Sequence, residues 1–452
     1  MKIYNSLSGQ KEEFKPAGEV VKIYVCGITP YDDSHIGHAM SYVIFDVVRR
    51  YLEYRNFKVK YIQNFTDIDD KIINRANRLG IPAKELADRF IERYFRDMDS
   101  LNIRRADSYP RVTEEIPEII KVVQGLIDRG HAYQAGGSVY FRVKSDPDYG
   151  KLSHRNPEDI SGDTAEENKE SALDFALWKA SQEGEPSWES PWGAGRPGWH
   201  IECTAMALKY LGTTIDIHGG GEDLVFPHHE NEIAQSECYT GKKPFASIWM
   251  HNGMVQLGKE KMSKSLGNII PIKDLLNIHS ADAIRLFIIN SHYRSPLTYS
   301  EEGLDAAEKG LERLRQAALK NTDSATNQSE INITDYRQRF ITAMDDDFGT
   351  PQAVATLFDL AREINKGREE HRDISQAQQT LTELANILGL TLAKKEDALL
   401  EANPFIELLI TLRNDLRAAK QWQLADKIRS SLTELGIILE DSPQGTTWKS
   451  KK

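Results

Sequence analysis

The stretch VKIYVCGITPYDDSHIGHAMSYVIF, residues 21–45, decides the fold of this 452-residue chain. Its first residues alternate as in a half-buried strand that ends at Cys26. Apolar residues then recur with helical spacing over residues 40–52, and a second strand-like run follows at residues 59–65. The order predicts a βαβ unit that opens a parallel sheet. The ligand of such a sheet lies beyond the carboxyl ends of its strands.

The tetrad His35-Ile36-Gly37-His38 stands where the predicted helix begins. Free backbone N–H groups and the helix dipole at this position favour an anion such as phosphate. Two histidines in an exposed loop would give the same four letters. The tetrad therefore indicates a phosphate site only if other segments support it.

Composition and charge describe a globular protein long enough for about three domains. A formal net charge of -11 argues against a generally basic surface, although it allows a local basic patch. Cys26, Cys203 and Cys238 are far apart and odd in number, which argues against a disulfide framework. Residues 1–19 contain no apolar leader, and no later run is long enough to span a bilayer. We expect a cytoplasmic enzyme without a membrane partner.

Polar side chains follow the second predicted strand. Thr66 and its acidic neighbours stand where the site residues of a parallel sheet often lie. Threonine and aspartate are also good N-cap residues, so the start of a helix explains them equally well. Further along, the polar stretch 144–170 interrupts the βαβ rhythm and predicts a loop in an inserted domain.

Regular structure is expected again at Trp199-His200-Ile201-Glu202-Cys203, where a helix begins. A short strand at residues 214–217 then leads into His218-Gly219-Gly220-Gly221-Glu222-Asp223. A glycine run after a strand lets the backbone approach a nucleotide, and an acidic side chain beside it suits ribose hydroxyls. A tight turn would use the same glycines.

Four residues from separate segments form a candidate zinc site. His228 and Glu232 are i and i+4 on one helix face, Cys26 ends a strand, and Cys203 lies on a helix. Thiolate, imidazole and carboxylate are ligands that zinc prefers, but lone cysteines are commonly inert core residues. Rival ligands are His200, His218 and His229. Cys238 lies off the face that carries the pair and is interpreted as a packing residue.

A cationic loop follows a strand-like run at residues 248–251. It reads Lys261-Met262-Ser263-Lys264-Ser265 between glycine hinges, and its two lysines can close over a polyphosphate. A solvated basic loop is the alternative. Beyond Ser300 the pattern predicts a helical bundle, followed from Pro404 by a smaller unit. That unit is expected to carry Arg413, Arg417 and Lys420 on one helical face, which a solvated surface explains as well.

The two signatures at 35–38 and 261–265, in this order and separated by an insertion, resemble those of class I aminoacyl-tRNA synthetases. Adding Cys26-Gly27, residues 199–203 and residues 226–232 narrows the resemblance to the cysteinyl-tRNA synthetase family. It implies an α/β fold: a split Rossmann-like catalytic domain with an inserted domain, then a helical bundle and a small C-terminal domain. The implied segments are 1–110 and 191–250 for the catalytic halves, 111–190 for the insertion, 251–304 for a stem with the 261–265 loop, 305–395 for the bundle and 396–452 for anticodon binding.

The resemblance also implies roles for particular residues. One zinc ion per chain would be held by Cys26, Cys203, His228 and Glu232. The cysteine substrate would contact Thr66, Trp199 and His218. Mg-ATP would contact His35, Gly37, His38, Gly220, Asp223 and Lys264. The catalytic roles would fall to His35, His38, Lys261 and Lys264. Cysteine tRNA would meet Arg413, Arg417 and Lys420. The enzyme would be a monomer that activates L-cysteine as the adenylate and transfers it to the terminal adenosine of the tRNA.

One segment departs from the wording of many synthetases. Residues 26–32, CGITPYD, look like the form in the related ligase that joins cysteine to an aminosugar in mycothiol synthesis. That ligase resembles a synthetase shortened at its C-terminus, whereas this chain continues through a helical bundle. It is the main alternative function. A non-catalytic zinc or RNA-binding relative is a third, but it would be expected to have lost one of the two phosphate signatures.

Overall fold

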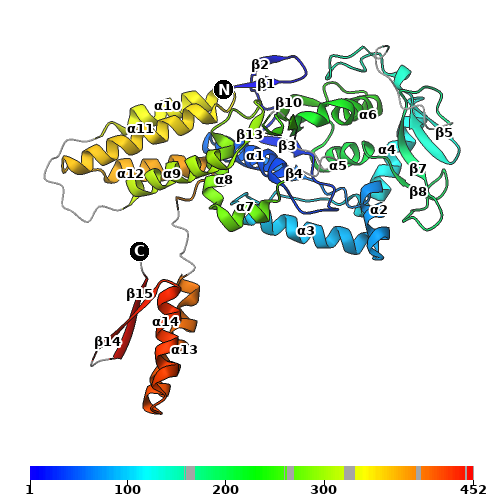
Figure 1. The fold of residues 1–452 in the computed structure, drawn as a ribbon. Coiled ribbons are helices and arrows are strands. Elements are labelled where there is room, and N and C mark those ends of the chain that lie inside the picture. Colours follow the sequence, from blue (N-terminus) through cyan, green and yellow to red (C-terminus); the bar gives the residue numbers. More distant parts are fainter. Residues whose placement is uncertain are drawn as a thin grey trace. The chain divides into compact units, whose positions relative to one another are not determined.

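Four parallel strands lie at the centre of the first of two units in the computed structural model (Figure 1). They pair in the order β10-β9-β3-β4. Their bounds are Ala246–Asn252, Ile215–Gly221, Val20–Val25 and Lys58–Gln63. Parallel strands need a crossover, and α1 (Ile36–Tyr54) supplies the one between β3 and β4. The predicted parallel α/β sheet is confirmed.

The units are Met1–Leu392 and Ala393–Lys452. The structure describes residues 1–156, 158, 168–258, 260–261, 269–319, 331–392, 399–442 and 445–450, with only the backbone at 260–261, 399–402 and 442. In these residues no helix is both long and apolar enough to cross a bilayer. The six segment boundaries expected from the sequence stay a prediction.

Alternate residues of β3 face two different cores. The odd-numbered residues pack with α1 in one cluster, whereas Cys26 packs in the other with α5 (Ile201–Leu211) and α6 (Glu230–Thr240). Helices therefore cover both faces of the sheet, as a parallel sheet requires. Because successive side chains of a strand point to opposite faces, Cys26 faces the helices that carry Cys203 and Glu232.

The glycine run at 219–221 continues β9, where the sequence predicted a shorter strand followed by a loop. Gly219 and Gly220 pair with Met250 and His251 of β10. A Cβ atom at Gly219 would come within 2.3 Å of the Phe45 ring, which belongs to α1. Gly219 therefore allows α1 to pack closely on the strand.

The inserted part combines a helix with an antiparallel sheet, β5-β6-β7-β8. The strands are Ala132–Ala135, Ser138–Phe141, Phe175–Ala180 and Gly195–Pro197. Its helix is α4 (Ile116–Asp128), while α2 (Asp70–Leu79) and α3 (Ala83–Ser100) precede the expected insertion. β5 and β6 form an antiparallel hairpin that turns at Gly136 and Gly137.

A small sheet and two helices join the catalytic sheet to a helical bundle. β11 (Val255–Leu257) pairs with β12 (Glu260–Lys261) and β13 (Leu297–Tyr299). The helices beside it are α7 (Ile272–Ile278) and α8 (Ala281–Ile289). Separately, β1 (Lys2–Asn5) and β2 (Gln10–Glu13) form a hairpin near the N-terminus. The predicted bundle is formed by α9 (Glu301–Ala318), α10 (Ile333–Asp345), α11 (Thr350–Glu369) and α12 (Ser375–Ile387).

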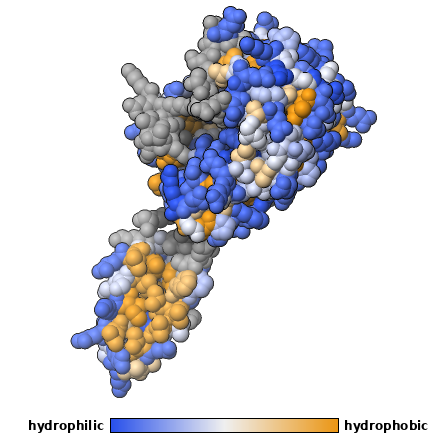
Figure 2. All heavy atoms as spheres, turned by 90° about the vertical axis from the view of Figure 1, so that its right-hand side faces the viewer, coloured by the Kyte–Doolittle hydropathy of each residue, from blue (hydrophilic) through white to orange (hydrophobic). Residues whose placement is uncertain are grey.

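The second unit packs α13 and α14 against a β14–β15 hairpin. The bounds are Leu399–Ala418, Trp422–Glu434, Ile437–Ser442 and Gly445–Ser450. Apolar side chains gather on one face of this unit (Figure 2), among them Leu424 and Leu435, which line a groove of about 320 Å³. The expectation that Arg413, Arg417 and Lys420 share one helical face is wrong for Lys420. The helix ends at Ala418, and the backbone at Lys420 is left-handed, with φ of 61°.

Candidate active site and metal centre

A cavity of about 410 Å³ opens at the carboxyl edge of the parallel sheet. Residues that directly follow β3 and β4 line it, together with the start of α1 and the end of β9. Nine of the expected site residues contribute to its wall: Cys26, His35, Gly37, His38, Thr66, Trp199, Cys203, Asp223 and His228. The cavity lies where the topology predicts a ligand.

The tetrad forms the first turn of α1. The rings of His35 and His38 stack at a centroid distance of 3.8 Å. The backbone N–H of His35 donates to Nδ1 of His38 at 3.3 Å, so the neutral His38 ring carries its hydrogen on Nε2. The backbone N–H of Ile36 donates to the Ile270 carbonyl at 3.0 Å, so the histidine rings and the positive end of the helix dipole are what favour an anion here.

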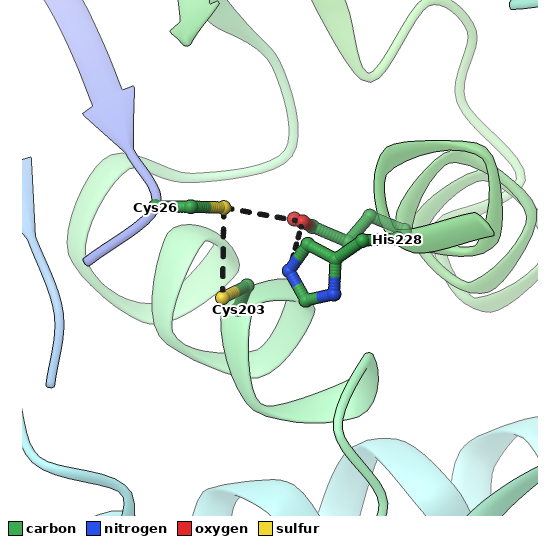
Figure 3. Close-up of side chains that lie close together, drawn as sticks. Cys26, Cys203 and His228 are labelled. Carbon is green, nitrogen blue, oxygen red and sulfur yellow. Dashed lines mark hydrogen bonds and ion pairs between the residues drawn. The ribbon is translucent and has the colours of Figure 1, made fainter. Parts of the chain in front are cut away.

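The four expected zinc ligands converge in one buried cluster (Figure 3). The Sγ atoms of Cys26 and Cys203 are 3.8 Å apart, and Cys26 Sγ lies 3.5 Å from Oε1 of Glu232. Nε2 of His228 is 3.0 Å from the same oxygen. All four ligand atoms lie within 4.8 Å of one another, which is compact enough for a single metal ion.

Mutual contacts in the cluster offset the cost of burial. Burial would raise the pKa of Glu232, yet His218 and His228 lower it to about 2. Burial also opposes ionisation of Cys203, but its contacts with Cys26 and His228 lower its pKa to about 6. Burial raises the pKa of Cys26 well above its usual value. A carboxylate and a thiolate, the forms that bind a cation, are therefore stabilised here even by the protein alone.

Comparisons with known proteins identify the family. A family described as the class I (C) catalytic domain of tRNA synthetases matches residues 13–309, and the DALR domain matches residues 339–393. A cysteine–tRNA ligase of Dehalococcoides mccartyi is 59% identical over 100% of both chains, and one of Cronobacter sakazakii is 52% identical over 100% of both. The chain belongs to the cysteine–tRNA ligase family. It is thus an aminoacyl-tRNA ligase.

Solved structures of other synthetases share the ligase fold at low identity. Methionyl-tRNA synthetase of Mycobacterium tuberculosis, in complex with methionyl-adenylate, has a TM-score of 0.61 and 16% identity, covering 83% of this chain and 90% of that one. A putative arginyl synthetase of Campylobacter jejuni has a TM-score of 0.54 and 14% identity, covering 84% and 92%. These likenesses concern the fold alone.

Two of the rival histidines of this ligase, His218 and His229, form a second candidate set with Cys26 and Glu232, whose ligand atoms also lie within 4.8 Å of one another. The third rival, His200, contacts His228 through their Nδ1 atoms at 3.1 Å. Nε2 of His218 bonds Oε2 of Glu232 at 2.8 Å, and Nε2 of His229 lies 3.3 Å from Cys26 Sγ. Nδ1 of His229 contacts Nε2 of His251 at 2.8 Å. His218 is fully buried and orients Glu232. Its expected contact with cysteine stays a prediction.

Cys238 lies on α6, outside the cluster, and is half-buried. Burial raises its pKa to about 12, so its thiol stays protonated. This environment agrees with the packing role expected from the sequence.

Two buried polar residues of the ligase site escaped the sequence reasoning. Glu202, 1% exposed, accepts a hydrogen bond from Thr66, and burial raises its pKa well above the usual range. Asn64, fully buried, contacts Thr66 from the other side. An acidic residue between apolar Ile201 and Cys203 on a buried helix was the available signal for Glu202.

Three of the residues expected to act in catalysis or to bind ATP are not in the described lining of the cavity: the catalytic Lys261 and the ATP contacts Lys264 and Gly220. The side chains of Lys261 and Lys264 lie outside the described residues. A Cβ atom added at Gly220 would meet Leu224 and His229 rather than open space. Their roles stay predictions.

In the second unit, Arg413 is 2% exposed and donates to both carboxylate oxygens of Asp441 at 2.9 and 2.8 Å. Arg417 contacts the same carboxylate at 3.3 Å and is more exposed. Arg413 thus serves the packing of its unit, while Arg417 and Lys420 keep their charge at the surface.

Proposed function

We propose that the chain activates L-cysteine with Mg-ATP as cysteinyl-adenylate and transfers it to the 3′-terminal adenosine of cysteine tRNA. One observation carries the proposal: a buried cluster with two thiols opens onto the same cavity as the anion-binding start of α1. The cavity therefore offers a sulfur-selective side and a phosphate side. The ligase relatives support this substrate pair.

The first step needs positioning and charge stabilisation but no enzyme nucleophile. A carboxylate oxygen of cysteine attacks the α-phosphorus, the bond from that phosphorus to the bridging oxygen breaks, and pyrophosphate leaves with the electron pair. His35 and His38, at the positive end of the α1 dipole, stabilise the charge that grows on the phosphate oxygens. Lys261 and Lys264 are proposed to close over the leaving pyrophosphate.

The second step transfers the cysteinyl group. The 2′-hydroxyl oxygen of the terminal adenosine attacks the carbonyl carbon, the bond to the phosphate oxygen breaks, and AMP leaves while the hydroxyl proton passes to the departing phosphate. The same histidines at the start of α1 favour the anionic leaving group.

The donor set fits zinc, because two thiols, one imidazole and one carboxylate are typical ligands, and all four are buried. Cys26, Cys203, His228 and Glu232 would hold the ion. A bound zinc ion would supply a soft Lewis acid that prefers a thiolate to an alcohol. Trp199 would wall the sulfur side, since its ring lies 4.5 Å from that of His228 and is 42% exposed.

The test is exchange of labelled pyrophosphate into ATP, with cysteine, serine or no amino acid, followed by charging of purified tRNA. Cysteine-dependent exchange and charging are expected. Exchange followed by transfer to an aminosugar instead of tRNA would favour the mycothiol-type ligase. Absence of cysteine-dependent exchange in the metal-loaded protein would contradict the proposal.

A further inference from the structure

Glu202 is a buried acidic side chain behind the wall of the cavity, and the proposed reaction gives it no role. It lies in the first turn of α5, directly before Cys203, and is 1% exposed. Its Oε1 accepts a hydrogen bond from the Thr66 hydroxyl. Thr66 is 4% exposed and lines the cavity. The buried acid therefore reaches the ligand only through Thr66.

Asn64 fixes the other side of Thr66. The backbone N–H of Gly27 donates to Oδ1 of Asn64 at 2.8 Å. Because that oxygen is occupied, the Asn64 amide presents Nδ2 to Thr66 Oγ1, at 3.4 Å. A Cβ atom at Gly27 would come within 1.5 Å of the Asn64 carbonyl oxygen, so only glycine allows this approach.

Asn64 and Glu202 together decide whether the Thr66 hydroxyl donates or accepts a hydrogen bond on its cavity side. A hydroxyl has one hydrogen and two lone pairs. Asn64 uses one lone pair, and Glu202 takes the hydrogen, which leaves one lone pair for the cavity. The direction holds for a carboxylate and for an acid whose proton sits on Oε2, because Oε1 accepts in both. A proton on Oε1 would reverse it and make Thr66 a donor to a carboxylate, the outcome that 3-mercaptopropionate tests.

We propose that Glu202 is a positioning residue that, with Asn64, makes Thr66 a hydrogen-bond acceptor for the α-ammonium group of cysteine. An ammonium group has only donors, whereas a carboxylate has only acceptors and would face a lone pair. The ammonium group of the substrate then lies beside Thr66 and its thiol beside Cys203. Its carboxylate is left to face the start of α1, where the phosphates of ATP are proposed to bind. The proposal rests on the proposed function.

The experiment uses the full metal-loaded chain and two inhibitors of cysteine-dependent exchange. Cysteamine has the thiol and the ammonium but no carboxylate, and 3-mercaptopropionate has the thiol and the carboxylate but no ammonium. In Glu202→Gln, whose amide can donate to Thr66, cysteamine should bind about 10-fold more weakly, and the KM for cysteine should rise similarly. Inhibition by 3-mercaptopropionate should stay within about twofold of wild type.

Two further variants connect the effect to Thr66. Thr66→Val should weaken cysteamine selectively, and Thr66→Ser should retain its binding. Adding Glu202→Gln to Thr66→Val should weaken it no further, since Glu202 acts through the hydroxyl. If Glu202→Gln does not fold, Glu202→Asp is measured in its place.

Equal weakening of both inhibitors would overturn the proposal, because Glu202 would then only support the fold. Weakening of 3-mercaptopropionate alone would also overturn it, since Thr66 would then donate to the carboxylate. Failure of the proposed function is a separate result, because it would abolish cysteine-dependent exchange in the wild type.

Discussion

Titratable residues that are distant in sequence come together in both units of the molecule. One such place is the cavity of the first unit, and another is the contact of α13 with Asp441 in the second unit. In the cavity wall, Cys203 and its partners lie within reach of one metal ion and still face open space. In the second unit, both terminal nitrogens of Arg413 are occupied by Asp441, and the nearby groove is apolar. Convergence of polar groups indicates a binding site only where one side of the cluster remains open to a ligand.

The largest expected effect is the preference of the cavity for cysteine over serine, which tests whether the metal cluster is open to the substrate. Serine is nearly isosteric with cysteine, and an apolar pocket separates such neighbours by only about 10- to 200-fold. A site with a bond that only the thiolate makes can reject serine by at least about 10⁴-fold. We expect this ratio in kcat/KM for pyrophosphate exchange. Serine competing within a hundredfold would reduce the cluster to a structural role.

The next prediction removes a ligand. Cys203→Ser should lower metal affinity by more than about 100-fold, since even residues around a metal ligand contribute 10- to 100-fold. Cysteine-dependent exchange should fall with it. Cys238→Ser is the matched control, because Cys238 lies on α6 outside the cluster. Metal content measured by atomic emission distinguishes the two variants, and full content in Cys203→Ser would refute the ligand assignment.

The third prediction divides the basic residues of the second unit by function. Arg413→Ala should lower the free energy of unfolding of that unit by about 1.5 kcal/mol, because it removes the two-pronged ion pair with Asp441, whose one-third-exposed carboxylate keeps Arg417 and Thr446 as partners. Replacing Arg417 and Lys420 together should hardly change stability. It should instead reduce the slope of log affinity for tRNA against log salt by about 2, if each residue meets a phosphate. The opposite pattern would restore Arg413 to the tRNA surface.

Only part of the cluster could be read from local geometry, since Cys26 and Cys203 are 177 residues apart and meet only in the packed fold. Strand parity set the side of Cys26, and i, i+4 spacing paired His228 with Glu232. The pairing of Arg413 could not be read, since Asp441 is 28 residues away on a hairpin. The helix end before Lys420 also lacks a glycine or proline signal in the sequence.

Packing determined what the motifs left out. The glycines after residue 218 suggested a nucleotide contact or a tight turn, but they continue β9, and the Phe45 ring on α1 leaves no room for a side chain at Gly219. Glu202 carries no motif that indicates a bond to Thr66, 136 residues away, because only the packed structure brings α5 beside the end of β4. Sequence patterns thus predicted which residues face the ligand better than which residues support them.

The smallest expected effect concerns one acidic side chain in each unit, Asp441 in the second and Asp97 in the first. Arg413 holds the pKa of Asp441 well below its usual value, whereas burial and the nearby Asp33 raise the pKa of Asp97 to about 6. Since the folded pKa of Asp97 lies above the unfolded value of about 3.9, its contribution to stability is present at low pH and lost as pH rises through 6. Asp97→Asn should therefore stabilise the protein at pH 8 by about 1 kcal/mol, a figure reduced because the carboxyl is half-exposed, and by less at pH 5. Urea midpoints at the two pH values measure the difference, with exposed Glu92→Gln on the same helix as control. An equal gain at both pH values would mean that ionisation of Asp97 is not the cause.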